Sequence, residues 1–340
     1  MNLLLATLLL AAQPSAQNDN TPRISGYQEV IISVADLEGW RDFLVEVGGW
    51  SVRHAGTVAR ERLDFLSLGE AWSAEEILLG NADQARGWIR LIRFDGGPQV
   101  QVRSNAQAWD TGGWFDFNVR TLDLDRKFAE MQARGWQAPT DPVTFEFGRF
   151  EVKEWLARGP DGVVIALIER IRPTLEGWDD LEHFSRAFNA TQIVSDFDAA
   201  LRFYREVLGF EIYLEHEGPS REPGPNVLGL PHNLAAEVPR RVAILHPDGV
   251  NEGSVEILSF EGVTGTDFSD RARAPNLGIL ALAFPVDDVH RLTEVLRARG
   301  ATILREPTDL DVPGLGSVAA ITVVGPDGAH LDFYASRERR

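Results

Sequence analysis

The feature that most constrains the fold of this chain is an internal repeat, in which residues 29–50 match residues 189–210 at an offset of 160. In both copies a strand rich in β-branched residues runs into an Asp that can cap a helix. Each predicted helix carries apolar residues at helical spacing and stops at a glycine suited to a left-handed C-terminal position. The matched positions pair Asp36 with Asp196, Phe43 with Phe203, Gly49 with Gly209 and Trp50 with Phe210.

A second repeat relates residues 114–169 to residues 281–334, at an offset that drifts between 165 and 167. Each copy predicts a strand, a helix ending in Ala-Arg-Gly, a Gly-Pro-Asp-Gly turn and a final apolar strand. In the turn, Pro fixes φ, Asp bonds its own backbone and Gly allows a positive φ. The chain therefore contains four units, near residues 26–105, 112–170, 186–262 and 278–336.

The four units predict an α+β fold, because strands dominate each unit and each unit has one helix. The 340 residues exceed one typical domain, since about 150 residues per domain is usual. A connector at residues 173–182 then divides the chain into two predicted domains, residues 24–172 and residues 183–336.

The order of motifs in these units points to a known superfamily. The motifs are Asp196-Phe197-Asp198, Phe203-Tyr204, Leu208-Gly209-Phe210 and the two Gly-Pro-Asp-Gly turns. Together they resemble the vicinal oxygen chelate superfamily, which includes glyoxalase I, extradiol dioxygenases, epimerases, thiol transferases acting on fosfomycin and metal-free, bleomycin-resistance-type proteins. The resemblance covers nearly all of residues 26–336. It implies two tandem glyoxalase-like domains, each of two βαβββ modules that curl an eight-stranded sheet into a cup.

In that superfamily the metal ligands lie at the start of each module's first strand and at an acidic position on its last strand. The resemblance places Asn189, Glu256 and Asp332 at three of these positions in the C-terminal half, with Ala281 at the fourth. Three oxygen donors suit Mg²⁺, Mn²⁺ or Ca²⁺ better than Zn²⁺ or iron. Since the set has no imidazole, the iron site of an extradiol dioxygenase is not expected. His330 shares the predicted strand face of Asp332 and is the candidate general acid or base.

The corresponding positions in the N-terminal half hold Glu29, Arg90, Trp114 and Ala166. Because Arg90 brings a cation to the place of a metal, we expect an ion pair between Glu29 and Arg90 that fills this cup. This half is then structural, or it binds a ligand without a metal. Trp114 belongs to a cluster of tryptophans between residues 40 and 136 that either stacks on a planar guest or packs in the core.

Three further features are candidates for the walls of a cup. Tyr213 and Tyr334 line a cup or belong to the core. The segment 217–225, rich in Pro and Gly, is a lid over the C-terminal cup or a plain surface insertion.

The N-terminus predicts export. Residues 3–12 are an apolar run, too short to span a bilayer, and a polar stretch follows them. We expect a signal peptide over residues 1–16 and a periplasmic or secreted protein; the alternative is a cytoplasmic protein with a disordered N-terminal tail. Beyond this leader the sequence predicts no membrane span.

Charge and cysteine content exclude several classes of function. The formal net charge of −18 repels nucleic acid and anionic lipid, so we expect neither as a partner. The absence of cysteine rules out disulfides, thiolate catalysis and Cys-ligated zinc.

Three functions remain open from the sequence. The first is metal-dependent lyase or isomerase chemistry on a small molecule in the C-terminal cup, and the second is metal-free binding of a small molecule. Two carboxylates buried in one cup are strongly unfavourable without a cation, so either a metal or an organic cation is expected as guest. The third is an interaction module that binds a basic partner through the acidic surface.

Overall fold

The structure is a computed structural model that describes residues 21–104, 107–178 and 181–337. The predicted leader, residues 1–16, lies outside the described residues. Of the helices that are described, none is long and apolar enough to cross a membrane.

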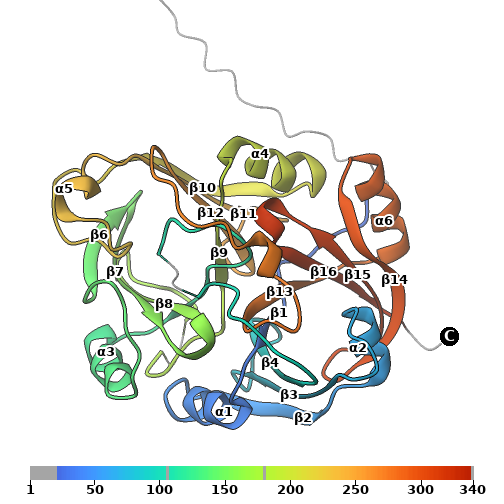
Figure 1. Ribbon diagram of the computed structural model, residues 1–340. Helices are drawn as coiled ribbons and strands as arrows, with labels where there is room; N and C mark the ends of the chain where they lie inside the picture. The colour runs from blue at the N-terminus through green and yellow to red at the C-terminus, as the bar shows by residue number, and fades with distance from the viewer. Residues whose placement is uncertain (1–20, 105–106, 179–180, 338–340) are drawn as a thin grey trace, which may run out of the picture.

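Two curved eight-stranded sheets dominate the described chain (Figure 1). The first sheet has the order β14 (Thr302–Val312), β15 (Gly316–Val324), β16 (His330–Ser336), β13 (Gly278–Pro285), β1 (Glu29–Ser33), β4 (Trp88–Asp95), β3 (Ser73–Gly80) and β2 (Ser51–Thr57). The second has the order β10 (Glu211–Gly218), β11 (Arg240–His246), β12 (Ser254–Phe260), β9 (Asn189–Ile193), β5 (Asp116–Arg120), β8 (Val164–Arg172), β7 (Phe150–Arg158) and β6 (Val143–Phe147). The predicted α+β class, with two modules in each sheet, is confirmed.

The modules that share a sheet are not the ones expected. The sequence predicted that the two modules of each half of the chain would form one sheet. The first sheet joins the first and fourth modules through antiparallel pairing of β1 with β13. The second sheet joins the second and third modules through antiparallel pairing of β5 with β9. The physical reason is that strand periodicity specifies which face of a strand is buried but not which neighbour it pairs with.

Each module contributes one main helix that begins at an Asp. The helices are α1 (Leu37–Glu46), α3 (Leu124–Gln132), α4 (Phe197–Arg202) with its π-helical continuation η2 (Phe203–Val207), and α6 (Val289–Ala298). In each, the Asp before the first helical residue accepts a hydrogen bond from a backbone N–H of the first turn, which satisfies one of the free donors there. The four helices lie around the outside of the molecule (Figure 1).

Short elements complete the chain. Two helices lie in the connections between strands of the first and third modules, α2 (Arg60–Phe65) and α5 (His232–Ala235). The remaining turns of helix are η1 (Pro160–Gly162), η3 (Ser269–Arg271) and η4 (Pro326–Gly328), of which η1 and η4 are the predicted Pro-Asp-Gly turns.

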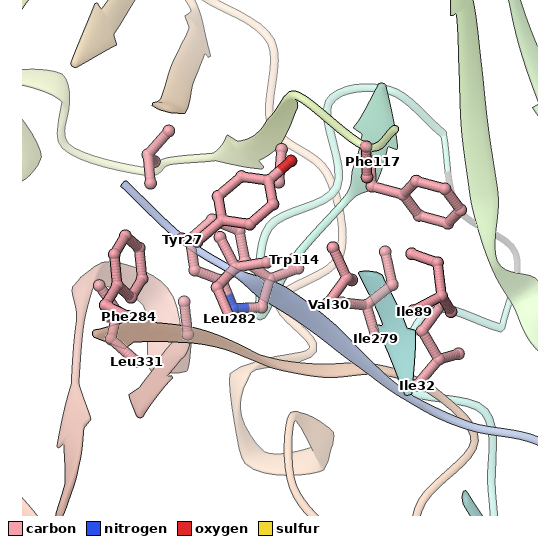
Figure 2. Close-up of a cluster of buried hydrophobic side chains, with 14 of the residues drawn as sticks. Tyr27, Val30, Ile32, Ile89, Trp114, Phe117, Ile279, Leu282, Phe284 and Leu331 are labelled. Carbon is pink, nitrogen blue, oxygen red and sulfur yellow. The ribbon is translucent and has the colours of Figure 1, made fainter. Parts of the chain in front are cut away.

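The main hydrophobic core combines one face of both sheets with the buried faces of the main helices. Trp40 and Phe43 of α1 contact Trp136, which follows α3 of the second module. The two modules of the N-terminal half therefore pack against each other through their helix-bearing faces. Figure 2 shows part of this core, where Tyr27, Trp114, Leu282 and Phe284 lie close together. The opposite face of each sheet is the concave one, and we call these faces the first cup and the second cup.

Candidate functional site

The first cup is filled by a buried ion-pair network centred on Arg90. Its guanidinium donates two hydrogen bonds to the carboxylate of Glu29, at 2.7 and 2.8 Å. A third hydrogen bond of 3.0 Å reaches Glu76, and a fourth of 2.8 Å reaches the carbonyl oxygen of Pro313. Glu76 also accepts from Arg62 of α2, at 2.5 Å. The predicted Glu29–Arg90 ion pair is therefore confirmed.

The space left in the first cup is small. A cavity of about 70 Å³ remains there, and Glu29, Arg90, His330, Asp332 and Tyr334 are among the residues that line it. Ligand pockets for drug-sized molecules usually measure roughly 300–1,000 Å³. As predicted, His330 and Asp332 share one face of β16.

Neither His330 nor Asp332 of β16 is free to act as a metal ligand or as a base. Asp332 accepts a 2.5 Å hydrogen bond from Thr322, which in turn accepts from Arg305. Burial, together with the positive charges of Arg305 and Arg273, lowers the pKa of His330 to about 4. His330 is thus neutral at pH 7 and a weak base, and its predicted catalytic role stays a prediction.

The predicted metal set of Asn189, Glu256 and Asp332 does not converge. Asp332 lies on β16 of the first sheet, whereas Asn189 and Glu256 lie on β9 and β12 of the second. The amide oxygen of Asn189 is occupied, because it accepts a 2.6 Å hydrogen bond from Asn118. This prediction is wrong because it rested on the assumption that the third and fourth modules share a sheet.

A metal ion of the kind found in this superfamily does not fit either cup. In the first cup the guanidinium of Arg90 occupies the lone pairs of Glu29 and stands where a cation would be held. Throughout the described ranges, no group of three or more His, Cys, Asp or Glu side chains is arranged to hold a metal ion.

The second cup contains three carboxyl groups that were only partly anticipated. In the first sheet, β4, β1 and β13 align Arg90, Ile31 and Ala281 in one row; in the second, β12, β9 and β5 align Glu256, Thr191 and Asp116. The two rows occupy equivalent places in the two sheets, so Asp116 is the counterpart of Ala281. The sequence alone had placed Trp114, two residues earlier, at this position.

The third carboxyl group of this cup is Glu154 on β7. It lies between Val152 and Leu156 on one face of the strand, and its charge interacts with that of Asp116. We call Asp116, Glu154 and Glu256 the carboxyl trio. The charged residue at position 154, between Val152 and Leu156 on one strand face, is the signal in the sequence that marks it.

The trio shares one electrostatic environment. Burial raises the pKa of Asp116 to about 7, against the opposing effect of its hydrogen bonds from Thr191. Burial and the negative charge of Asp116 raise the pKa of Glu154 to about 8. Burial, followed by the charges of Asp116 and Glu154, holds the pKa of Glu256 well above its usual range. Each group therefore resists ionisation chiefly because it is buried, and acidic neighbours add to this effect at Glu154 and Glu256.

The trio lies beside an apolar surface in the second cup. Leu156, Val164, Ala166, Ile193, Val242 and Leu258 form a buried cluster on this face. Glu154 and Glu256 keep a partly exposed surface, so solvent reaches them. The site is thus an apolar floor with a titratable acidic patch.

The connection between β10 and β11 approaches the same cup. Val227 and Leu228 of this connection pack against the apolar cluster, and Arg221 forms an exposed ion pair with Glu146 of β6 at 3.1 Å. The predicted lid segment, residues 217–225, begins this connection. The residues that contact the cup follow immediately after it.

The remaining predicted pocket residues do not form one pocket. Trp114 is buried in the main core (Figure 2). Its indole N–H donates a 3.0 Å hydrogen bond to the carbonyl oxygen of His330. Tyr334 lines the first cup, and Tyr213 lies on β10 of the second sheet. Core packing thus accounts for Trp114, and the two tyrosines belong to different cups.

Comparisons with known proteins agree with this architecture. Residues 181–333 match the family model of the Glyoxalase/Bleomycin resistance protein/Dioxygenase superfamily. Glyoxalase I from Zea mays is 16% identical, with a TM-score of 0.61, over 91% of this chain and 92% of that chain. A putative dioxygenase from Bacillus subtilis is 10% identical, with a TM-score of 0.57, over 93% of this chain and 86% of that chain.

Among curated protein sequences, none matches this chain. At these identities the likeness to the two solved structures concerns the fold. The fold of these two solved structures thus extends over both halves of the chain, and residues 181–333 also match the superfamily's model by sequence.

Proposed function

We propose that this protein binds a small organic molecule carrying a cationic group, in the second cup and without a metal ion. The observation that supports the proposal is the carboxyl trio. No described side chain forms an ion pair with Asp116, Glu154 or Glu256, and burial raises the pKa of all three, with acidic neighbours adding to it at Glu154 and Glu256. An unpaired buried carboxylate costs several kcal/mol, so such a group takes up either a proton or a positive guest.

The choice of the second cup follows from a comparison of the two. In the first cup, Arg90 already supplies the cation for Glu29 and Glu76. In the second cup the acidic groups have no such partner in the described chain. The apolar cluster beside them favours a guest whose cationic group is attached to an aliphatic or aromatic body.

Titration of the protein with hexylammonium tests the proposal. We expect saturable binding at pH 7 that Glu256→Gln weakens at least tenfold, because the isosteric amide keeps the shape but removes the ionisable group. Glu215→Gln is the matched control, since Glu215 lies exposed on β10 of the same sheet. We expect the control to bind as the wild type does.

The same experiment separates this proposal from a metal-dependent one. Binding that survives dialysis against a chelator supports a metal-free site. Binding that appears only after addition of Mg²⁺, Mn²⁺ or Ca²⁺, or that Glu256→Gln leaves unchanged, would overturn the proposal.

A second candidate function, proton transfer on the bound guest, is favoured by one specific observation. Raised pKa values of about 7 and about 8, at Asp116 and Glu154, place two carboxyl groups near neutrality. Such a pair suits general acid–base chemistry, which includes the lyase and isomerase reactions considered from the sequence. Deuterium uptake from D2O into a bound ligand, lost in Glu154→Gln, tests it; no uptake by the wild type contradicts it.

Export of the protein remains part of the proposal. Its only basis is the apolar run at residues 3–12. N-terminal sequencing of the protein from its natural source checks it. A mature chain that begins near Gln17 supports export, and a chain that keeps residues 1–16 contradicts it.

A further inference from the structure

Two arginines on the second cup lack an acidic partner. Arg120 ends β5 and Arg170 lies near the end of β8, both on the same sheet. Arg120 is only 4% exposed. In the described part of the chain, neither guanidinium forms an ion pair or donates a hydrogen bond, and the Nε–H of each is buried without a partner.

Aromatic rings hold the two guanidinium groups in place. Arg120 lies 4.0 Å above the ring of Phe188 and 4.8 Å from that of Trp178. Arg170 lies 4.0 Å above the ring of Phe150. Stacking of this kind covers the flat face of a guanidinium but leaves its N–H donors, which lie in the plane, free to bind an anion.

The two positive charges also repel each other. Burial, and then the charge of Arg170, lowers the pKa of Arg120 to about 9. The phenol of Tyr213 lies near both arginines and acts in the opposite direction. Arg186 is next to this group but is already paired with Glu252. Arg120 and Arg170 therefore lie in a positively charged environment, in which the carboxylate that acts on Arg120, Glu252, is already paired.

The arginine pair and the carboxyl trio lie on the same face of the second sheet, where Glu154 is in register with Arg120 across β8 and Asp116 lies further along β5. Asp116 and Arg120 are four residues apart on β5, which corresponds to roughly 13 Å along a strand. Side chains at such spacing point to the same face of the sheet. One cup thus presents carboxyl groups and guanidinium groups, with Asn118 between Asp116 and Arg120 on β5.

We propose that Arg120 and Arg170 form a binding site for a carboxylate, and that the guest of the second cup is a zwitterion whose ammonium group meets the carboxyl trio. The ammonium group of this guest rests on the proposed function above. Its carboxylate group rests on the arginine pair alone. Two guanidinium groups that act on each other electrostatically offer the planar donors that recognise a carboxylate.

Binding of acetate tests the site formed by Arg120 and Arg170 by itself. We expect acetate to shift the NMR signals of the Nε–H groups of Arg120 and Arg170, and the shift to disappear as pH rises through about 9, where Arg120 loses its charge. Arg120→Gln is expected to abolish the response of Arg170, whereas Arg93→Gln, on β4 of the other sheet, is the control and leaves it intact. Acetate that leaves both signals unmoved would overturn the site.

A series of α,ω-amino carboxylates tests the arginine pair and the carboxyl trio together. We expect one chain length to bind at least tenfold more tightly than hexylammonium or hexanoate, because it reaches both groups at once. Arg120→Gln should reduce its affinity to that of hexylammonium, and Glu256→Gln to that of hexanoate. Arg170→Gln provides a second variant if Arg120→Gln does not fold, as judged by thermal melting.

The outcomes distinguish the two proposals. If Glu256→Gln weakens the amino carboxylate while Arg120→Gln and Arg170→Gln do not, the anionic site is wrong and the proposed function stands. If the arginine variants weaken it while Glu256→Gln does not, the cationic guest is wrong and the anionic site stands. An affinity that all three variants leave unchanged overturns both.

Discussion

At the scale of single residues, Arg90 and Arg120 are both buried on concave faces but have opposite surroundings. Arg90 donates to two carboxylates and to a backbone carbonyl, and these partners raise its pKa above the ordinary value despite burial. Arg120 donates to no described side chain, and burial lowers its pKa to about 9. The same side chain is thus a structural cation in one cup and a candidate ligand-binding group in the other.

The structural role of Arg90 leads to a stability prediction. Arg90→Met leaves Glu29 and Glu76 buried without their main cation. We expect the free energy of unfolding to fall by about 3–5 kcal/mol, measured by urea denaturation. Arg93→Met, which removes an exposed ion pair from the same strand, should cost about 0–1 kcal/mol. Equal losses in the two variants would contradict the account.

The raised pKa of Glu154 predicts the pH dependence of stability. The folded pKa is about 8, against an ordinary 4.5, so between these values the folded protein binds more protons than the unfolded chain. The contribution of Glu154 to stability is therefore complete below about pH 4.5 and is lost as pH rises through about 8. Glu154→Gln should match the wild type at pH 4.5 and exceed it by up to about 5 kcal/mol at pH 9. Thermal melts that fall equally with pH in both proteins would argue against this pKa.

At the scale of elements, the Pro-Asp-Gly turns connect neighbouring modules. Asp161 of η1 accepts hydrogen bonds from the backbone N–H of Ala35 and the indole N–H of Trp40, at 3.2 and 2.9 Å. Asp327 of η4 accepts from the backbone N–H of Ser195, at 3.1 Å. Both aspartates adopt a positive φ, 59° and 47°, which Asn also tolerates. The turn motif therefore holds the start of the partner module's helix as well as turning the chain.

Substitution of Asp327 tests this role. Asp327→Ala removes the acceptor for Ser195 and places Ala at a positive φ, so we expect a loss of about 1–3 kcal/mol in the free energy of unfolding. Asp327→Asn keeps an acceptor and tolerates the backbone, and should cost less than half as much. Thermal denaturation of both variants measures the difference. An Asn variant as unstable as the Ala variant would refute the role.

Most elements were predictable from the sequence because each carries a local signal. The repeat located the modules, and Asp36 and Asp196 cap their helices as expected. The insertions α2 and α5 had no repeated counterpart, yet Arg62 of α2 helps to fill the first cup. At the site, counting placed Trp114 where strand register places Asp116. Register depends on tertiary pairing, which local patterns do not specify.

At the scale of the whole molecule, the two halves of the chain are interdependent. Each sheet contains four strands from the N-terminal half and four from the C-terminal half. The pairs β1–β13 and β5–β9 join the halves at the middle of both sheets. Glu256 comes from one half and Asp116 and Glu154 from the other. The candidate site therefore exists only when both halves are present.

Separation of the halves tests this dependence. We expect residues 21–178 and residues 181–337, expressed apart, each to lack cooperative thermal unfolding, because strands β1, β5, β9 and β13 would lose a neighbour. Mixed together, they should form a 1:1 complex that unfolds cooperatively, as seen by size-exclusion chromatography and circular dichroism. A half that is monomeric and unfolds cooperatively alone would contradict the pairing.

The most direct test of the central claim, a cation site made by protonated carboxyl groups, is the number of protons released when hexylammonium binds. Calorimetric titration at pH 7, in two buffers of different ionisation enthalpy, measures this number. Because the pKa of Glu154 is about 8 and that of Glu256 is held well above its usual range, a bound cation should ionise the trio and release roughly 0.5–1 proton per guest. Binding with no proton release, or with proton uptake, would contradict the account.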